Sequence, residues 1–134
     1  MLLGRFFVRQ EQDISIIEEK LKKMCQTLDI DPIKRAKMIK RLREVILQLK
    51  DDFFSEVELQ FDLVEKNKIT GLTILCKISQ SSFDNFEDAG ILIEEYRDNE
   101  GSISPSDLHK IQKEFDQISE ESLVDLLRSF RRPS

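Results

Sequence analysis

The side chains that most often carry catalysis are scarce in this chain, and none has the neighbours that its chemistry requires. The only histidine, His109, follows Leu108 in a segment whose apolar spacing predicts a helix, and it falls on the solvent side of that helix. A catalytic histidine works beside a carboxylate and a nucleophile, so the sequence favours a surface histidine. The run from Asp98 to Gly101 is too short for a calcium loop and is typical of a turn. We therefore expect no catalytic residue, no metal site and no cofactor.

The two cysteines, Cys25 and Cys76, lie within apolar patterns, and their spacing does not suit a metal pair. Buried free thiols in a reducing cytoplasm are the expected state. The first residues lack the charged-then-apolar layout of a secretory signal, and no apolar run reaches the ~18 residues of a membrane span. We expect a cytoplasmic protein without membrane contact.

Charge is unevenly distributed along the 134 residues. Residues 18–50 carry ten Lys and Arg against five Asp and Glu, whereas residues 51–125 carry six against nineteen. A domain with charges separated in this way is suited to docking on a charged protein surface. Nucleic acid is a rival partner for the basic stretch, but the stretch lacks interleaved aromatic residues and the chain has a net charge of −5. The other alternative is a solvated surface whose charges pair within the domain.

The first fifty residues carry the pattern of a strand followed by two helices. Residues 2–9 contain a β-favouring cluster of two Phe and a Val and predict a short strand. The next helix is expected to start at Asp13 or Ser15 and to end near Asp29, because apolar residues recur there every three or four positions. A second amphipathic helix with a basic outer face is expected from Pro32 to about residue 50.

The period then changes from 3.6 to 2. Apolar and polar residues alternate over residues 57–63 and again over residues 72–78, with a turn at 66–68 between them. This pattern predicts an antiparallel hairpin with one buried face.

Helical spacing returns, more weakly, after the hairpin. Phe83, Phe86, Ile93 and Tyr96 fit a helix, although Gly90 lies in its middle. Ser104 starts a further predicted helix, and Ser119 starts a short last one. The last one places Leu123, Leu127 and Phe130 on one side, either packed on the domain or available to a dimer or another partner. The whole pattern predicts the α+β class, with a small antiparallel or mixed sheet, helices packed on one of its faces, and C-terminal helices.

This order of elements, together with local motifs, resembles a known family. Residues 5–14 (RFFVRQEQDI) are similar to the opening of bacterial anti-sigma-factor-type serine kinases, which belong to the GHKL (histidine kinase-like) ATPase superfamily. Leu28–Asp31 loosely matches the link between the family's first two helices. Ser104–Leu108 is similar to a segment that follows such domains in multidomain signalling proteins. The resemblance implies a kinase-like ATPase scaffold over residues 1–100 (strand, two helices, hairpin, helix) and a C-terminal helical extension over residues 101–134.

The same resemblance places the family's functional residues on side chains of other types. The carboxylate of its second-helix motif falls at Glu44, but its magnesium-binding Asn falls at Gln48, which could ligate only with a shifted metal. The Asp that reads adenine falls at Ile78, which accepts no hydrogen bond. Two glycines fall at Gln80 and Ser82, whose side chains obstruct a backbone approach to nucleotide. Glu44 and Gln48 are therefore expected to be vestigial positions of a lost nucleotide site.

We therefore expect a non-catalytic bacterial signalling domain, a degenerate pseudo-kinase scaffold that works through protein–protein contacts. Its partner would be an antagonist protein, a receiver or a histidine kinase module, and a homodimer is a second expectation. The basic helix face, with Lys37, Lys40 and Arg41, would meet an acidic patch on that partner. Two alternatives are kept: a residual ATP-binding serine kinase that uses Glu44 and Gln48, and an unrelated dimerising scaffold.

Overall fold

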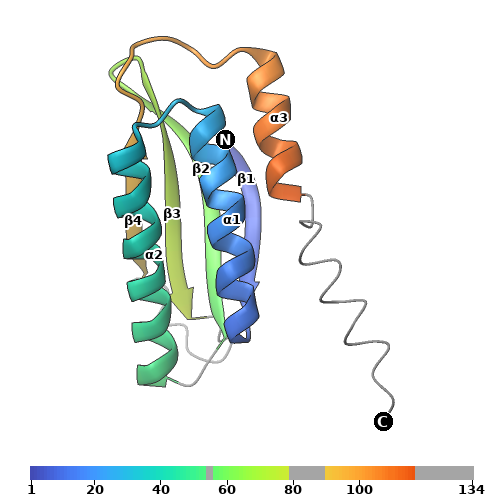
Figure 1. Cartoon of the computed structure of the whole chain (residues 1–134), viewed down its shortest axis with the longest axis vertical. Helices are drawn as coiled ribbons and strands as arrows, with labels where there is room; N and C mark the ends of the chain where they lie inside the picture. The colour runs from blue at the N-terminus through green and yellow to red at the C-terminus, as the bar shows by residue number, and fades with distance from the viewer. Residues whose placement is uncertain (54–55, 79–89, 117–134) are drawn as a thin grey trace.

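The computed structural model describes residues 1–53, 56–78 and 90–116, with three helices beside a four-stranded sheet (Figure 1). In chain order the elements are β1 (Leu2–Val8), α1 (Glu11–Thr27), α2 (Pro32–Phe53), β2 (Val57–Lys66), β3 (Ile69–Ile78), β4 (Ile91–Tyr96) and α3 (Pro105–Asp116). The predicted α+β class is confirmed.

The sheet follows the order of the chain, β1-β2-β3-β4, and every neighbouring pair is antiparallel. The predicted hairpin is present, with Lys66 paired to Ile69 across a two-residue turn. Asn67 and Lys68 form this turn with φ values of 54° and 66°. Two consecutive positive φ values give the turn a twist that matches that of the two strands. Local sequence therefore determines how the two central strands pair.

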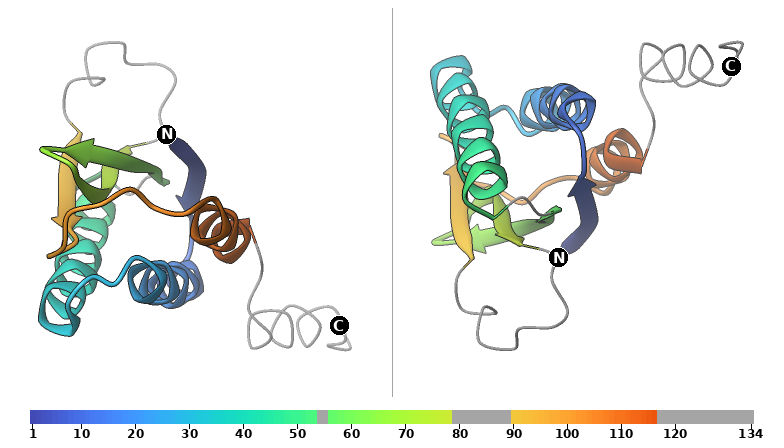
Figure 2. Two further views of the ribbon diagram at one scale, coloured as in Figure 1. Left: turned by 90° about the horizontal axis from the view of Figure 1, so that it is seen from above. Right: turned by 90° about the horizontal axis from the view of Figure 1, so that it is seen from below.

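The first two helices cover one face of the sheet, and no helix of the described residues covers the opposite face (Figure 2). The alternating strand pattern explains this arrangement, because each strand turns one apolar set of side chains toward the helices. From β2 and β3 this set includes Leu59, Phe61, Leu72, Ile74 and Cys76, all fully buried. On the helix side, the apolar face of the predicted amphipathic helix α2 contributes buried Met38, Leu42, Val45, Ile46 and Leu49, and Ile39 is partly buried against them.

The start of α1 differs from the sequence prediction. The helix begins at Glu11, with Gln10 as its N-cap, so Ser15 lies inside the helix and exposed to solvent. Asp13 is the third helical residue, and its carboxylate accepts hydrogen bonds from the backbone N–H groups of Arg9 at 2.9 Å and Gln10 at 3.1 Å. An acid in the first turn satisfies free amide groups and favours the positive end of the helix. Asp13 therefore stabilises the helix start from inside the first turn.

The helix expected around Ile93 and Tyr96 is wrong, because these residues form strand β4. Their partners in β3 are Ile74 and Gly71. A strand here places Ile93 in the core and leaves Leu92 on the uncovered face of the sheet. The part of the expected helix that contained Phe83 and Phe86 lies outside the described residues.

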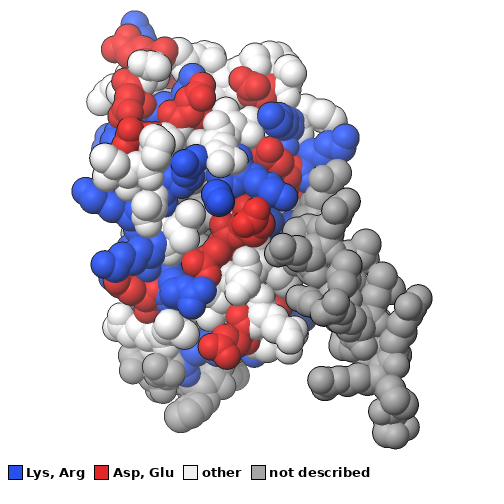
Figure 3. Space-filling view, viewed as in Figure 1, with Lys and Arg blue, Asp and Glu red and all other residues white. Residues whose placement is uncertain are grey.

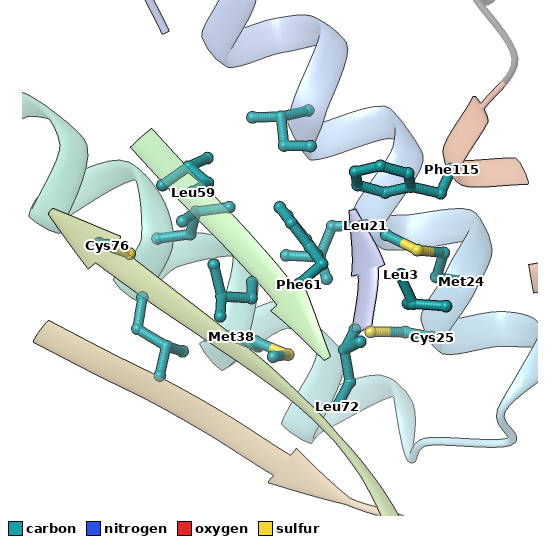
Figure 4. Packing of buried hydrophobic residues seen from close by; sticks show 14 of the residues in the cluster. Leu3, Leu21, Met24, Cys25, Met38, Leu59, Phe61, Leu72, Cys76 and Phe115 are labelled. Atoms are coloured by element: carbon teal, nitrogen blue, oxygen red, sulfur yellow. The ribbon is translucent and has the colours of Figure 1, made fainter. Parts of the chain in front are cut away.

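The predicted helix start at Ser104 is confirmed, since the Ser104 Oγ accepts a hydrogen bond from the Asp107 N–H at 3.1 Å. Its helix, α3, packs against α1 and β1 and belongs to the same core as the sheet. The ring of Phe115 lies 5.2 Å from that of Phe61, centroid to centroid (Figure 4). The Gln112 side chain donates to the backbone carbonyl of Leu3 at 3.0 Å. The last helix expected after Ser119, with Leu123, Leu126, Leu127 and Phe130, lies outside the described residues.

None of the helices within the described ranges combines the length and the apolar character that crossing a bilayer would take.

Candidate functional site

The three basic residues singled out on α2, namely Lys37, Lys40 and Arg41, are all exposed. Arg41 has one ion pair, a 4.0 Å contact with Glu44 one turn further along the same helix. Among the described residues, Lys37 and Lys40 have no acidic partner within ion-pair distance. In Figure 3, Lys and Arg side chains gather at mid-height on the left of the view, where Figure 1 places α2. We call Lys37, Lys40 and Arg41 the basic face.

Two other cations on the same helix have close acidic partners. The Lys34 ammonium contacts the Asp98 carboxylate after β4, and the Arg43 guanidinium contacts the Glu18 carboxylate on α1. The hydrogen bond to Asp98 raises the pKa of Lys34, and the hydrogen bond to Glu18 raises the pKa of Arg43. The basic face thus differs from Lys34 and Arg43, which form close ion pairs with other elements.

These two pairs also show how α2 is rotated about its axis. Arg43 points toward α1, and Lys34 points toward the end of β4, where its ammonium also donates to the Tyr96 carbonyl at 3.4 Å. At 3.6 residues per turn, Arg41 lies about 20° and Lys37 about 60° from Lys34 around the helix, whereas Lys40 lies about 120° away. Lys37 and Arg41 therefore belong to the flank of α2 beside β4, and Lys40 faces solvent.

The positions that the family resemblance marks as vestigial lie on the outer side of α2. Glu44 and Gln48 are one turn apart, and both are exposed, the Glu44 side chain by 54%. Neither lines the cavity described below. Ile78, at the position of the adenine-reading Asp, pairs with Val57 at the end of β3. Gln80 and Ser82 lie outside the described residues.

A cavity of about 680 Å³ opens between β1, α1 and the end of α3. Its basic side chains are already bonded within the domain. Arg9 pairs with Glu56 at 2.8 Å, and Arg5 lies 3.7 Å from Glu58. The buried ammonium of Lys20 donates to the backbone carbonyl of Phe115, and burial lowers the pKa of this lysine. The two arginine contacts join the β1 and β2 segments, and the lysine joins α1 to α3, so we assign the cavity a structural role. Sequence analysis missed it because its walls come from segments far apart in the chain.

The nucleophile candidates occupy positions unsuited to catalysis. His109 is exposed on α3, as predicted. Cys25 and Cys76 are free and buried, also as predicted, and burial raises the pKa of each thiol to about 12. A thiol held protonated in this way is a poor nucleophile and a poor metal ligand. Over the described part of the chain, no three His, Cys, Asp or Glu side chains gather in a way that would hold a metal ion.

Among the described residues we therefore take the basic face as the candidate site, and the chemistry open to it is the binding of negative charge. Unlike a catalytic centre, it consists of flexible exposed cations on a rigid helix. Comparison of the chain with protein-family models, with curated proteins and with solved structures gives no match.

Proposed function

We propose that this protein is a non-catalytic regulatory domain of bacterial signalling, and that its basic face binds an acidic surface on a protein partner. One observation carries the proposal: Lys37 and Lys40 have no acidic partner among the described residues, and Arg41 has only a 4.0 Å one. The neighbouring cations Lys34 and Arg43 are both engaged.

Physical considerations support a role in recognition. A long ion pair between two exposed side chains of one helix adds little to the stability of the fold, because solvent screens the two charges. An exposed cation instead accelerates encounter with an acidic surface and disfavours a basic one, so it contributes to association rate and to partner choice. The acidic half of the chain repels acidic partners elsewhere and thereby restricts where they dock.

The test uses two baits that differ only in the basic face. The wild-type chain and the Lys37→Glu/Lys40→Glu/Arg41→Glu variant are immobilised and exposed to lysate of the producing organism, and the bound proteins are quantified by mass spectrometry. A true partner should be acidic and should be lost from the variant. Its affinity, then measured with the purified partner, should fall by about tenfold or more and should weaken with added salt.

A control variant separates this face from net charge. Lys22, Lys23 and Lys110 are exposed on α1 and α3, and reversing all three changes the net charge by the same amount. This control should retain the partner. If both variants lost the partner equally, the effect would come from net charge and not from the basic face. If both retained it equally, the basic face would have no part in the function. Circular dichroism and thermal unfolding of each variant check that the fold is intact.

A further inference from the structure

The two edge strands of the sheet, β1 and β4, differ in what lies beside their outer edges. Helix α3 packs against the first residues of β1, where its Gln112 side chain donates to the Leu3 carbonyl at 3.0 Å, and the following residues of β1 line the cavity. Strand β4 forms the other edge, and no strand among the described residues pairs with its outer side. An uncovered edge strand presents free N–H and C=O groups and is a template for another strand.

One hydrogen bond fixes which residues of β4 face outward. The Arg97 N–H donates to the Thr70 carbonyl of the β3 side at 2.9 Å. Because bonding direction alternates along an antiparallel pair, Ile91, Ile93 and Glu95 also bond toward β3. The backbone groups of Leu92, Glu94 and Tyr96 therefore point away from the sheet. The Tyr96 carbonyl accepts from Lys34, and no described residue bonds to the outward groups of Leu92 and Glu94, which can receive a new strand.

Natural sheets usually protect such an edge, and β4 is short and carries Glu94 and Glu95, but it lacks the stronger devices. The segment 91–96 (ILIEEY) contains no proline and no lysine, and its pairing with β3 is regular from end to end. Leu92, with 56% of its surface exposed, lies on the face of the sheet that α1 and α2 leave uncovered. An apolar residue at an open edge offers packing to a side chain of the added strand.

The flank of α2 completes the recognition surface on the opposite side. Lys37 and Arg41 lie on the same flank of α2 as Lys34, whose ammonium contacts Tyr96 and Asp98 at the end of β4. A strand added to β4 would turn alternate side chains toward this flank and the others toward Leu92. Acidic side chains suit the first set, because Lys37 and Arg41 are exposed and their charge is mostly uncompensated. Apolar side chains suit the second set.

We propose that the partner docks as an extended segment of alternating acidic and apolar residues, which adds to the outer edge of β4 as a fifth strand. Its acidic side chains lie along Lys37 and Arg41, and its apolar side chains lie beside Leu92. This inference rests on the proposed function, because it names the form in which the acidic partner meets the basic face. Main-chain hydrogen bonds supply the docking, and side-chain alternation supplies the specificity.

The probe is an eight-residue peptide that alternates Val and Glu, with blocked ends and a fluorescent label. Its binding to the full chain is followed by fluorescence anisotropy at low and high salt. We expect saturable one-to-one binding that weakens with salt. A peptide of the same composition with its Val and Glu in two blocks should bind at least about tenfold more weakly, because it cannot present one acidic and one apolar side.

Backbone pairing is tested on both molecules. Glu94→Pro removes one outward N–H, and Glu94→Ala removes the same carboxylate but keeps the N–H. We expect Glu94→Pro to weaken peptide binding by about tenfold and Glu94→Ala to leave it intact or slightly stronger. Methylation of alternate peptide nitrogens, which leaves the protein unchanged, should abolish binding even if Glu94→Pro disturbs the fold. Unchanged affinity with the methylated peptide overturns strand addition.

The charge contacts are tested separately. Lys37→Glu with Arg41→Glu should weaken binding, whereas the control Lys22→Glu with Lys23→Glu, exposed on α1 and equal in charge change, should alter it little. If charge reversal weakens binding and backbone methylation does not, strand addition fails and the proposed function stands. If methylation abolishes binding and charge reversal has no effect, the basic face fails instead. A chain that dimerises in sedimentation, and loses the dimer with Glu94→Pro, would make a second copy the occupant and overturn the partner proposal.

Discussion

At the scale of single residues, the buried thiols have the most sharply defined chemistry. Burial raises the pKa of Cys25 and of Cys76 to about 12, against an ordinary value of 9.0. The cause is the cost of placing a thiolate among apolar side chains. Both thiols should therefore be unreactive toward a thiol reagent at pH 8 and become reactive when the chain unfolds. Rapid modification of the native protein would contradict their burial.

The same shift links these thiols to stability at high pH. Well below pH 9 the thiols are protonated in both states and do not affect the pH dependence. Between pH 9 and 12 the unfolded chain loses protons that the folded chain keeps, so the free energy of unfolding falls as pH rises. The slope approaches about 1.4 kcal/mol per pH unit for each thiol. Urea unfolding at pH 8 to 10.5 should show a shallower decline for Cys25→Ala/Cys76→Ala than for the wild type.

Sequence alone could predict that Lys37, Lys40 and Arg41 are exposed, because they lie opposite the apolar stripe of a long amphipathic helix. It could not predict which α2 cations are already paired. The partner of Lys34 is Asp98, and that of Arg43 is Glu18, each on another element and far away in the sequence. Ion pairing of this kind depends on the tertiary arrangement, so the difference between engaged and available cations required the structure.

At the scale of elements, the strands show where local pattern was sufficient and where it was not. The β2–β3 hairpin was predicted because its alternation is long and its turn is short. The segment Ile91–Tyr96 was wrongly predicted as a helix. Its apolar run is short enough to fit either period, and Phe83 and Phe86 upstream suggested helical spacing. Pairing with β3 decides in favour of a strand. The open edge could not be predicted from a pattern interpreted as helical.

The contact between β1 and α3 gives a prediction at this scale. Gly4 has φ +155°, and a Cβ there would lie 2.5 Å from a Phe115 ring atom. The pairing of β1 with β2 also shifts register between Leu2 and Gly4. We expect Gly4→Ala to lower the free energy of unfolding by about 2 to 4 kcal/mol, because backbone strain and overpacking add.

The matched control is Gly101→Ala. Gly101 also has a positive φ, +132°, but no atom lies within 4 Å of the added methyl group. We expect Gly101→Ala to lower the free energy of unfolding by about 1 kcal/mol, from backbone strain alone. Urea unfolding of both variants measures the difference. Equal losses in the free energy of unfolding would mean that the Phe115 ring moves aside for the added methyl group and that α3 packs loosely against β1.

At the scale of the whole molecule, the fold separates its stabilising contacts from its free surface. The core extends across the sheet beneath α1 and α2, and the α3 contacts and the cavity lie at its β1 end. The β4 edge and the basic face lie together at the other end of the sheet. A partner that binds there leaves the core contacts undisturbed, as a regulatory domain requires. The proposed function and the strand addition both depend on this separation.

The separation also bears on nucleotide binding. Glu44 and Gln48 lie on the solvent-exposed side of α2, away from the cavity, and a magnesium–phosphate group there would have no enclosing wall among the described residues. A nucleotide held by exposed side chains alone competes poorly with water. We therefore expect calorimetric titration with magnesium and ATP to millimolar concentration to give no saturable heat, and the thermal midpoint to stay unchanged. Saturable one-to-one binding that is lost in Glu44→Ala/Gln48→Ala would instead establish a working nucleotide site, and would make the partner contacts secondary to it.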